Sequence, residues 1–361
     1  MNIKQLKNNE QGLVAIVVTL IIMLVLTLIV TGFAQLARRE QREALDRQLA
    51  SQALYAAESG VNAAEAAVNQ DQIDGNTDNY SKCGDFENSP NGVLSKDIVN
   101  ENERPTCILV KKDVPELKYQ NVQTNKSTIA PITQKDKGPI ENLTISWQNA
   151  DGANQILNQT VNGAGNIVTG NPFTPAGDWN TPNQHVGVMR IDLVPVNNLT
   201  PSVLREGMFT AFLIPTINGT GVIGYSAGAT TANQGIKVAA KCNGASRKKC
   251  AVRIEGLKIP GQTTYYLRMK SIYNVSDVVV CPSQGFGCDE DASLVGAQAE
   301  IDVTAKAADV LKRVQVRINT DLNASGTTTI PEYTLDSAES ICKLLDVTPT
   351  TTTDYCGTVT P

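Results

Sequence analysis

Three consecutive cations, Arg247, Lys248 and Lys249, lie between Cys242 and Cys250. If these two cysteines form a disulfide, the bridge closes a short loop that presents three positive charges at one exposed tip. Cations gathered in this way attract phosphate, nucleic acid or an acidic glycan. The sequence therefore contains one candidate ligand loop, and a solvated basic turn is the simpler alternative.

A second candidate is a calcium loop after residue 73. Asp74, Asn76 and Asp78 supply oxygen ligands at alternate positions, and Asp85 falls where the twelfth ligand of such a loop would lie. Asn79 replaces the glycine that is expected after the third ligand, so the motif is incomplete. We predict no cofactor, with calcium at these residues as the alternative.

All eight cysteines lie beyond residue 80 and fall into neighbouring pairs. An even set of this kind is typical of disulfides that form outside a reducing cytosol. A zinc site is disfavoured because no Cys-x-x-Cys spacing occurs. Eight cysteines allow on the order of a hundred connectivities, so local pairing is a preference. The preferred pairs are Cys83–Cys107, Cys242–Cys250, Cys281–Cys288 and Cys342–Cys356.

Catalytic groups are scarce in this chain. The single histidine, His185, leaves little room for histidine-based catalysis, and no Ser or Cys nucleophile arrangement accompanies it. A net charge of -5 argues against a generally basic nucleic-acid binder. An exported glycan hydrolase with paired carboxylates is an alternative, but no sequence feature selects a pair. We predict that the protein is not an enzyme and that nucleic acid is not its main partner.

An apolar helix must hold the exported part at the cell surface. Residues 13–37 contain no charged side chain. As a helix with a rise of about 1.5 Å per residue they reach about 38 Å, enough to cross a hydrocarbon core of about 30 Å. Basic residues flank both ends, so the exported cysteines set the orientation, with the short end inside. A signal peptide cleaved near residues 32–34 is the alternative, although its apolar region would be unusually long.

The helical pattern continues beyond residue 37. No proline occurs in residues 35–70, so the helix is expected to extend through residues 38–70 as an amphipathic continuation. Small or apolar residues recur there at three- and four-residue spacing. This narrow face is the predicted seat of a globular domain, and its members are Leu45, Leu49, Ala53, Ala56, Gly60, Ala63 or Ala64, and Ala67.

Beyond residue 70 the composition favours β-structure, so we predict an α+β fold in which the long N-terminal helix packs on a β-rich antiparallel head. The clearest hairpin joins residues 297–307 to residues 310–318. The other expected strands are 106–110, 143–147, 186–194, 208–214, 236–242, 250–257, 264–273 and 278–281.

The length of the chain, 361 residues, exceeds the usual ceiling for one compact core. We therefore expect two parts after the helix. Residues 71–183 are assigned to a loop-rich subdomain of unknown fold, and residues 184–361 to a β-rich head that ends in a disulfide loop.

The N-terminal residues resemble type IV pilins and type II secretion pseudopilins. A short polar leader ends in Glu10-Gln11-Gly12, and an apolar block opens directly after it at Leu13. Residues 46–50 and 55–61 are similar to the first helix of PilX-like minor pilins. The resemblance covers about the first 70 residues and implies a structural role.

The resemblance implies that a prepilin peptidase removes residues 1–12 after Gly12 and that the new terminus, Leu13, is N-methylated. The apolar helix would then be retained and become the packing core of a filament. The implied partners are prepilin peptidase, the membrane before assembly, other pilin subunits through the N-terminal helix, and a host or partner cell surface.

One residue departs from the pattern of the major pilins. They carry a glutamate at the fifth mature position, where it neutralises the terminal amine of a neighbouring subunit, and the matching residue here is Val17. An unpaired ammonium group buried in the filament core costs several kcal/mol. A subunit without this carboxylate should therefore pack poorly beneath another pilin, which favours a minor or tip subunit.

We therefore expect a structural subunit of a type IV pilus-like filament with a surface adhesion or assembly role. The precursor would reside in the cell membrane and the mature subunit in the extracellular pilus. The alternative is a single-pass, membrane-anchored extracellular binding protein that never polymerises.

Overall fold

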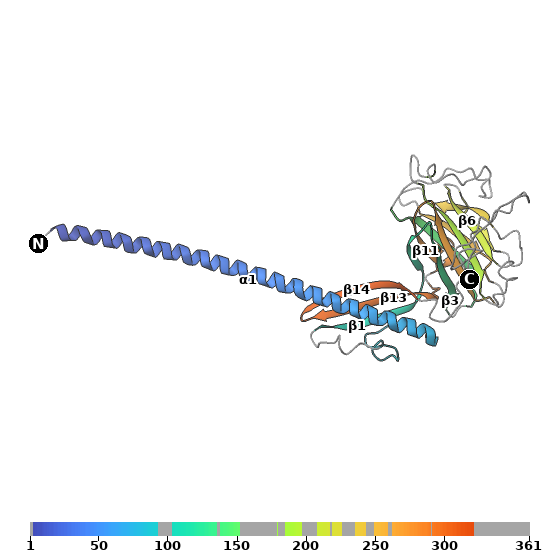
Figure 1. Ribbon diagram of the computed structural model, residues 1–361, viewed down its shortest axis with the longest axis horizontal. Helices are drawn as coiled ribbons and strands as arrows, with labels where there is room; N and C mark the ends of the chain where they lie inside the picture. Colours follow the sequence, from blue (N-terminus) through green and yellow to red (C-terminus); the bar gives the residue numbers. More distant parts are fainter. Residues whose placement is uncertain are drawn as a thin grey trace, which may run out of the picture.

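The computed structural model combines one long helix with a large β-sheet (Figure 1). It describes residues 3–92, 103–135, 138–151, 179, 185–196, 208–216, 219–225, 235–242, 249–258, 262–289 and 291–320. The helix packs on the sheet near one end of the molecule, and the sheet is mostly antiparallel. The predicted α+β class, with a long apolar helix on a disulfide-bonded β head, is confirmed.

Helix α1 (Ile3–Asp74) is continuous over 72 residues and ends at a glycine. Gly75 has φ +74°, which is the left-handed conformation that stops a helix. The Asn76 amide donates to the Asp71 carbonyl at 2.7 Å, and the Gly75 amide donates to the Gln72 carbonyl at 3.3 Å. These two bonds form a Schellman cap, so the helix ends four residues beyond the predicted limit at residue 70.

The sheet contains fourteen strands in the described part of the chain. All of the strands predicted from alternation are present, and β2, β3, β7 and β12 are additional. The strands are β1 (Glu103–Val114), β2 (Leu117–Val122), β3 (Thr128–Gln134), β4 (Asn142–Asn149), β5 (Val188–Pro195), β6 (Phe209–Thr216), β7 (Val222–Gly224), β8 (Ile236–Cys242), β9 (Cys250–Glu255), β10 (Thr264–Ile272), β11 (Ser276–Gln284), β12 (Gly287–Cys288), β13 (Leu294–Ala307) and β14 (Val310–Asn319).

The strand order shows that segments distant in sequence are neighbours. The path runs β1-β13-β3-β10-β5-β6-β8-β9-β4-β11-β12, with β14 on β13, β2 on β11 and β7 on β9. The β6–β8 and β7–β9 pairs are parallel and the other pairs are antiparallel. The predicted late hairpin is formed by β13 and β14, which pair from Ala307 and Val310 at the turn to Gln298 and Asn319.

Two large hydrophobic cores divide the molecule. The smaller core lies where β1, β13 and β14 run along the second half of α1, and it contains residues from Ala56 to Val110 and from Ala299 to Ile318. The larger core contains residues from Val114 to Ala297 and lies beyond the end of the helix (Figure 1). Strand β13 contributes its first residues to the larger core and its later residues to the smaller core.

The larger core is thus an insertion between two neighbouring strands. β1 pairs with β13, while the chain between Val114 and Leu294 builds most of the sheet. The predicted boundary at residue 183 does not coincide with a gap in the sheet. Strands β3 and β4, which precede this position, pair with β10, β9 and β11, which follow it. Because these pairings join distant residues, alternation along the chain does not reveal them.

Candidate functional site: the apolar helix and its junction with the head

The first half of α1 projects from the rest of the protein (Figure 1). Its large apolar side chains from Val14 to Leu36 are exposed. Met23 is 71% exposed and Phe33 is 68% exposed. The helix from Val14 onward contains an 18-residue window with a mean hydropathy of 3.1, which is enough by length and composition to cross a membrane. Exposed apolar surface of this extent requires lipid or other apolar helices around it.

The polar groups in the apolar half are satisfied within the helix. The hydroxyl of Thr19 donates to the Ile16 carbonyl at 2.9 Å, and that of Thr27 donates to the Leu24 carbonyl at 2.8 Å. Thr31 makes the equivalent bond to its own helix. Back-bonding of this kind removes the need for external hydrogen-bond partners. The surface of residues 14–34 is therefore almost entirely apolar.

The residues expected to direct processing and packing all lie on this helix. Gly12 and Leu13 lie within α1, and so does Val17. The side chain of Val17 is half exposed, and its neighbours on the helix surface are apolar. No charged side chain lies between Leu13 and Ala37. The helix therefore carries no carboxylate of its own in this region with which to neutralise a buried amine.

The second half of α1 forms the seat of the head, on the small-residue face that the sequence predicts, except that the predicted member Leu45 is 57% exposed. Ala53, Ala57 and Ala64 have no exposed surface. At Gly60 the helix approaches β13 so closely that a Cβ atom would lie 2.8 Å from Cγ1 of Val303 and 3.1 Å from Cγ of Pro105. Only glycine fits this approach without displacing a neighbour, so Gly60 sets the distance between the helix and the sheet.

A buried polar cluster joins the end of α1 to the head. The carboxylate of Asp71 accepts a hydrogen bond from Lys112 Nζ at 2.8 Å and one from Asn91 Nδ2 at 2.8 Å. It also accepts one from the Tyr80 hydroxyl. Asp71 has no exposed surface and the Lys112 side chain is 8% exposed. The pair therefore links the last turn of the helix to β1 through a buried contact.

The cluster shifts the titration of two of its members. Burial opposes ionisation of Asp71, but hydrogen bonds from Lys112, Tyr80 and Asn91 and the charge of Lys112 outweigh it, so the pKa of the carboxyl lies below its ordinary value. Burial and the hydrogen bond to Asp71 raise the pKa of Tyr80 to about 12. Asp71 is thus charged and Tyr80 neutral around neutral pH, which is the state that the hydrogen bonds require.

The segment after the helix is fastened to β1 by backbone bonds and a disulfide. Tyr80 and Val110 exchange two backbone hydrogen bonds of 2.9 Å each. Cys83 and Cys107, each three residues from this contact, form a disulfide between the same two segments. The ring of Phe86 packs edge-on against Tyr80 in the smaller core. The helix end, this segment and β1 therefore form one connected unit.

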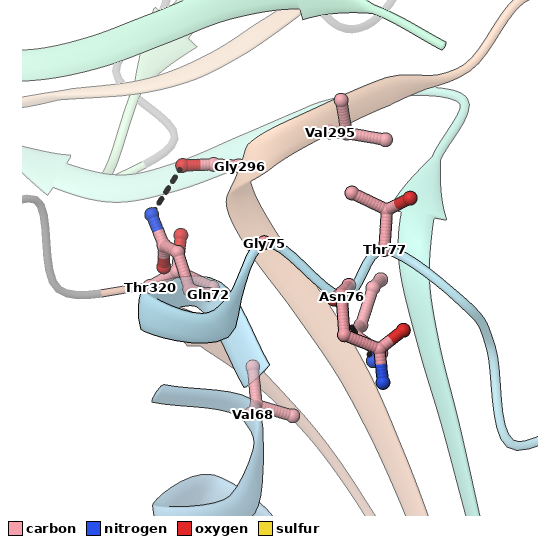
Figure 2. A pocket seen from close by; sticks show the side chains of 9 residues that line it. Val68, Gln72, Gly75, Asn76, Thr77, Val295, Gly296 and Thr320 are labelled. Carbon is pink, nitrogen blue, oxygen red and sulfur yellow. Dashed lines mark hydrogen bonds between the residues drawn. The ribbon is translucent and has the colours of Figure 1, made fainter. Parts of the chain in front are cut away.

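A small cavity of about 70 Å³ marks the joint between the two cores. Figure 2 shows that Gln72 and Gly75 at the end of α1 face Val295 and Gly296 of β13 across it. Gln72 Nε2 donates to the Gly296 carbonyl at 3.4 Å. Gly296 has φ +80°, at the irregularity where β13 passes from one core to the other. The cavity belongs to the junction and separates the helix end from the larger core.

The four residues of the predicted calcium loop take other roles. Asp85 Oδ2 accepts hydrogen bonds from the backbone amides of Ser81 and Lys82, at 3.1 and 2.8 Å. Asp74 accepts from Asn91, and the side-chain oxygen of Asn76 accepts from the Asp78 amide. In the described ranges no three His, Cys, Asp or Glu side chains form a group that could hold a metal ion. A calcium loop would also use amide and carbonyl oxygens, so calcium at these residues stays a prediction.

Three of the four preferred cysteine pairs lie in the described residues, and each is a disulfide: Cys83–Cys107, Cys242–Cys250 and Cys281–Cys288. The fourth, Cys342–Cys356, lies outside the described residues, as do Arg247 and Lys248 of the basic loop. Lys249 is described and exposed, directly before β9. The disulfide between Cys242 and Cys250 confirms the predicted closure of the loop that contains the three cations.

The lone histidine has a structural role in the described part of the protein. The carbonyl of His185 accepts hydrogen bonds from Asn149 Nδ2 at 2.9 Å and from Asn274 Nδ2 at 2.7 Å. Its imidazole packs against Trp179, which stacks on Tyr273. These contacts connect β4, the turn between β10 and β11, and the entry to β5.

Sequence reasoning missed the Asp71–Lys112 pair, although each residue carries a signal. Strand β1 places Ile108, Val110 and Val114 in the cores, so Lys112 occupies an inward position in a strand of period two. Asp71 falls four residues after Ala67, on the small-residue face of the helix. A charge at an inward position of each element predicts a buried partner, but only their three-dimensional arrangement identifies it.

One comparison with known proteins found a match, and it lies on the first helix. Residues 11–62 match the family model described as PilX N-terminal. No curated protein and no solved structure matched the chain. The matched residues cover the apolar half of α1 and the start of its seat for the head, which is where the exposed apolar surface and the small-residue face meet. The chain thus carries, at residues 11–62, the PilX N-terminal domain that indicates a PilX-like type IV minor pilin.

Proposed function

We propose that this protein is a minor subunit of a type IV pilus-like filament, that it occupies or lies near the filament tip, and that its head has an adhesive or assembly role. The PilX N-terminal domain supports the class of protein. The observation that carries the proposal is the bare apolar half of α1, because a helix that is exposed on all sides needs apolar neighbours once it leaves the bilayer.

The lack of a carboxylate at Val17 supports a position at the filament tip. In a shaft, each subunit would bury the terminal amine of a neighbour, and a carboxylate at the fifth mature position would neutralise it. Val17 occupies this position and offers no charge. An uncompensated buried ammonium costs several kcal/mol. A position at the filament tip, where fewer subunits pack against this helix, is therefore favoured.

The size of the head supports display at the filament surface. The insertion between β1 and β13 builds a second core that lies beyond the end of α1. A filament packs its subunits through the helices, so a body placed beyond the helix end adds exposed surface without entering the packing core (Figure 1). This surface is where binding to a host or partner cell would occur.

The test is processing and assembly in the native host. Gly12→Leu is expected to accumulate as uncut precursor in the membrane, and sheared pili are expected to lack this subunit. Gly32→Leu is the matched control, because Gly32 lies on the same helix and no neighbouring atom lies within 4 Å of a Cβ placed there. Recovery of an intact Met1 from unmodified cells would support the anchored, non-polymerising protein instead.

A further inference from the structure

The outward face of the large sheet contains a groove of about 480 Å³ between two disulfides. Strands β8, β9, β4 and β11 form its floor, and the Cys242–Cys250 and Cys281–Cys288 bridges border it. Its volume falls in the range of small-molecule sites. Its lining includes Thr144, Ser146, Lys241, Lys249, Ala251, Val279 and Phe286.

The groove exists because one row of the sheet carries small residues at its centre. Lys241, Ala251, Ser146 and Val279 are consecutive partners across the four strands. The residues on either side of them in each strand belong to the larger core, so this row points outward. Ala251 and Ser146 at the centre leave a hollow that longer side chains would fill, and Lys241 lies at one end of the row.

Two disulfides border the groove on opposite sides. The Cys242–Cys250 bridge spans a sequence separation of 8 and holds Lys249 beside the floor. The Cys281–Cys288 bridge spans a sequence separation of 7 and holds Phe286 on the other side. The Lys241 ammonium lies 4.7 Å from the centre of the Phe286 ring. The two disulfides constrain the positions of Lys249 and Phe286, which lowers the entropy that is lost when a ligand orders these side chains.

The chemistry of the lining selects an anion with polar and apolar faces. Lys241 and Lys249 are exposed, and within the described residues neither forms an ion pair. The carboxylate of Glu116, which also borders the groove, is neutralised by Lys118. Thr144 is 2% exposed, and in the part of the chain that the structure describes its hydroxyl has no hydrogen-bond partner. The lining therefore carries excess positive charge and unused hydroxyl capacity.

We propose that this groove binds an acidic sugar, that is, a pyranose ring that carries a carboxylate. The ammonium groups of Lys241 and Lys249 form ion pairs with the carboxylate. The hydroxyl groups of Ser146 and Thr144 form hydrogen bonds with the sugar hydroxyls. Phe286 and Val279 contact the apolar ring face. Inorganic phosphate has no apolar face and would make no favourable contact with Phe286 and Val279. A nucleic acid strand needs successive stacking platforms along a cationic track, and the groove has one aromatic ring.

The inference deepens the adhesive part of the proposed function and rests on it for display of the head outside the cell. Binding itself is a property of the folded protein and does not require a filament. The experiment therefore uses the full chain purified in detergent micelles. Failure of binding and failure of assembly are then separate results, because assembly is measured on sheared pili.

Saturation-transfer NMR and titration calorimetry are performed with four sugars. Digalacturonate and 3′-sialyllactose carry a carboxylate from two different sources, and digalactose and lactose are their neutral counterparts. Saturable binding of at least one acidic sugar, at least about tenfold tighter than its neutral counterpart, is the expected result. The acidic sugar that binds identifies the source as a hexuronate or a sialate.

Two variants localise the binding to the groove. Lys241→Gln removes one ammonium and is expected to weaken binding about tenfold or more, as for loss of a hydrogen bond to a charged group. Ala251→Leu fills the centre of the floor and is expected to abolish binding. Lys312→Gln is the matched control on exposed β14 and is expected to leave binding unchanged. Thermal melting of each variant checks that the head is folded.

Several outcomes would overturn the proposal. Absence of saturable binding for both acidic sugars would do so, as would equal binding of the neutral sugars. Equal competition by inorganic phosphate would show that the sugar ring contributes nothing. If folded Ala251→Leu retains its affinity for the acidic sugar, the sugar binds elsewhere. If single-stranded DNA binds the groove residues more tightly than the acidic sugars do, the ligand belongs to a different class.

Discussion

Lys112 Nζ lies 2.8 Å from Asp71 Oδ2 in a buried site, and this contact connects the last turn of α1 to β1. Burying two charges is costly unless they pair and find further hydrogen bonds. Asp71 meets this condition through Tyr80 and Asn91 as well as Lys112. The head therefore has one defined position along the helix, since a shift of either element would leave a buried charge without its partner.

Asp71→Asn is expected to destabilise the junction by about 3–5 kcal/mol, because it leaves the Lys112 ammonium buried without a counter-charge. Hydrogen–deuterium exchange of residues 103–114 and 294–319 measures the loss of protection. The double variant Asp71→Asn with Lys112→Met is expected to recover part of the loss. Glu43→Gln is the control, since its ion pair with Arg39 is exposed and such pairs contribute about 1 kcal/mol or less. An additive double variant would contradict the coupling.

The stability of the junction is expected to depend on pH at both extremes. The pKa of Asp71 is lowered by folding, so its contribution is present above the unfolded value of about 3.9 and is lost as the pH falls through the folded value. The pKa of Tyr80 is raised to about 12, so its contribution is present below the unfolded value of about 10 and is lost as the pH rises toward 12.

Chemical denaturation at graded pH checks this dependence. The difference in unfolding free energy between the unmodified protein and Asp71→Asn isolates the acidic arm, because other carboxylates cancel. Tyr80→Phe isolates the alkaline arm in the same way. A difference that stays constant from neutral pH down to pH values below about 4 would contradict the assignment of the acidic arm to Asp71.

Gly60→Leu is expected to separate the helix from β13. A Cβ atom at this position already lies 2.8 Å from Cγ1 of Val303, so a longer side chain forces repacking at a cost of about 1–3 kcal/mol or more. Asn62→Leu is the matched control, because Asn62 is exposed on the same turn of α1. Exchange protection of β1, β13 and β14 is expected to fall in the first variant only. Equal effects of the two variants would show that helix propensity, and not the close approach, governs this site.

Val17→Glu tests the proposed position of the subunit. A carboxylate at this residue would neutralise a neighbouring terminal amine, so incorporation along the shaft is expected to rise several-fold relative to the unmodified subunit. The ratio of this protein to the major subunit in sheared pili measures it. Val18→Glu is the control, since it adds the same charge at the adjacent helix position and is expected to reduce incorporation. If the ratio of this protein to the major subunit is the same for Val17→Glu and the unmodified protein, the missing carboxylate does not limit its incorporation along the shaft.

The sequence by itself determined the features that depend on local pattern. The charge-free stretch of residues 13–37 and the absence of proline up to residue 70 predicted the helix, and the three- and four-residue spacing predicted its small-residue face. Alternation predicted the hairpin of β13 and β14. Near spacing of cysteines favoured the three disulfides that the described residues contain. These features require only neighbours along the chain, so their information is present in the sequence.

Only the tertiary structure decided which distant segments meet. β1 and β13 pair across a sequence separation of nearly two hundred residues, which turns the intervening chain into an insertion with its own core. The same long-range pairing brings Lys112 to Asp71 and aligns Lys241, Ala251, Ser146 and Val279 in one row. Register between strands that are far apart depends on the joint packing of all of them, and no local period carries that information.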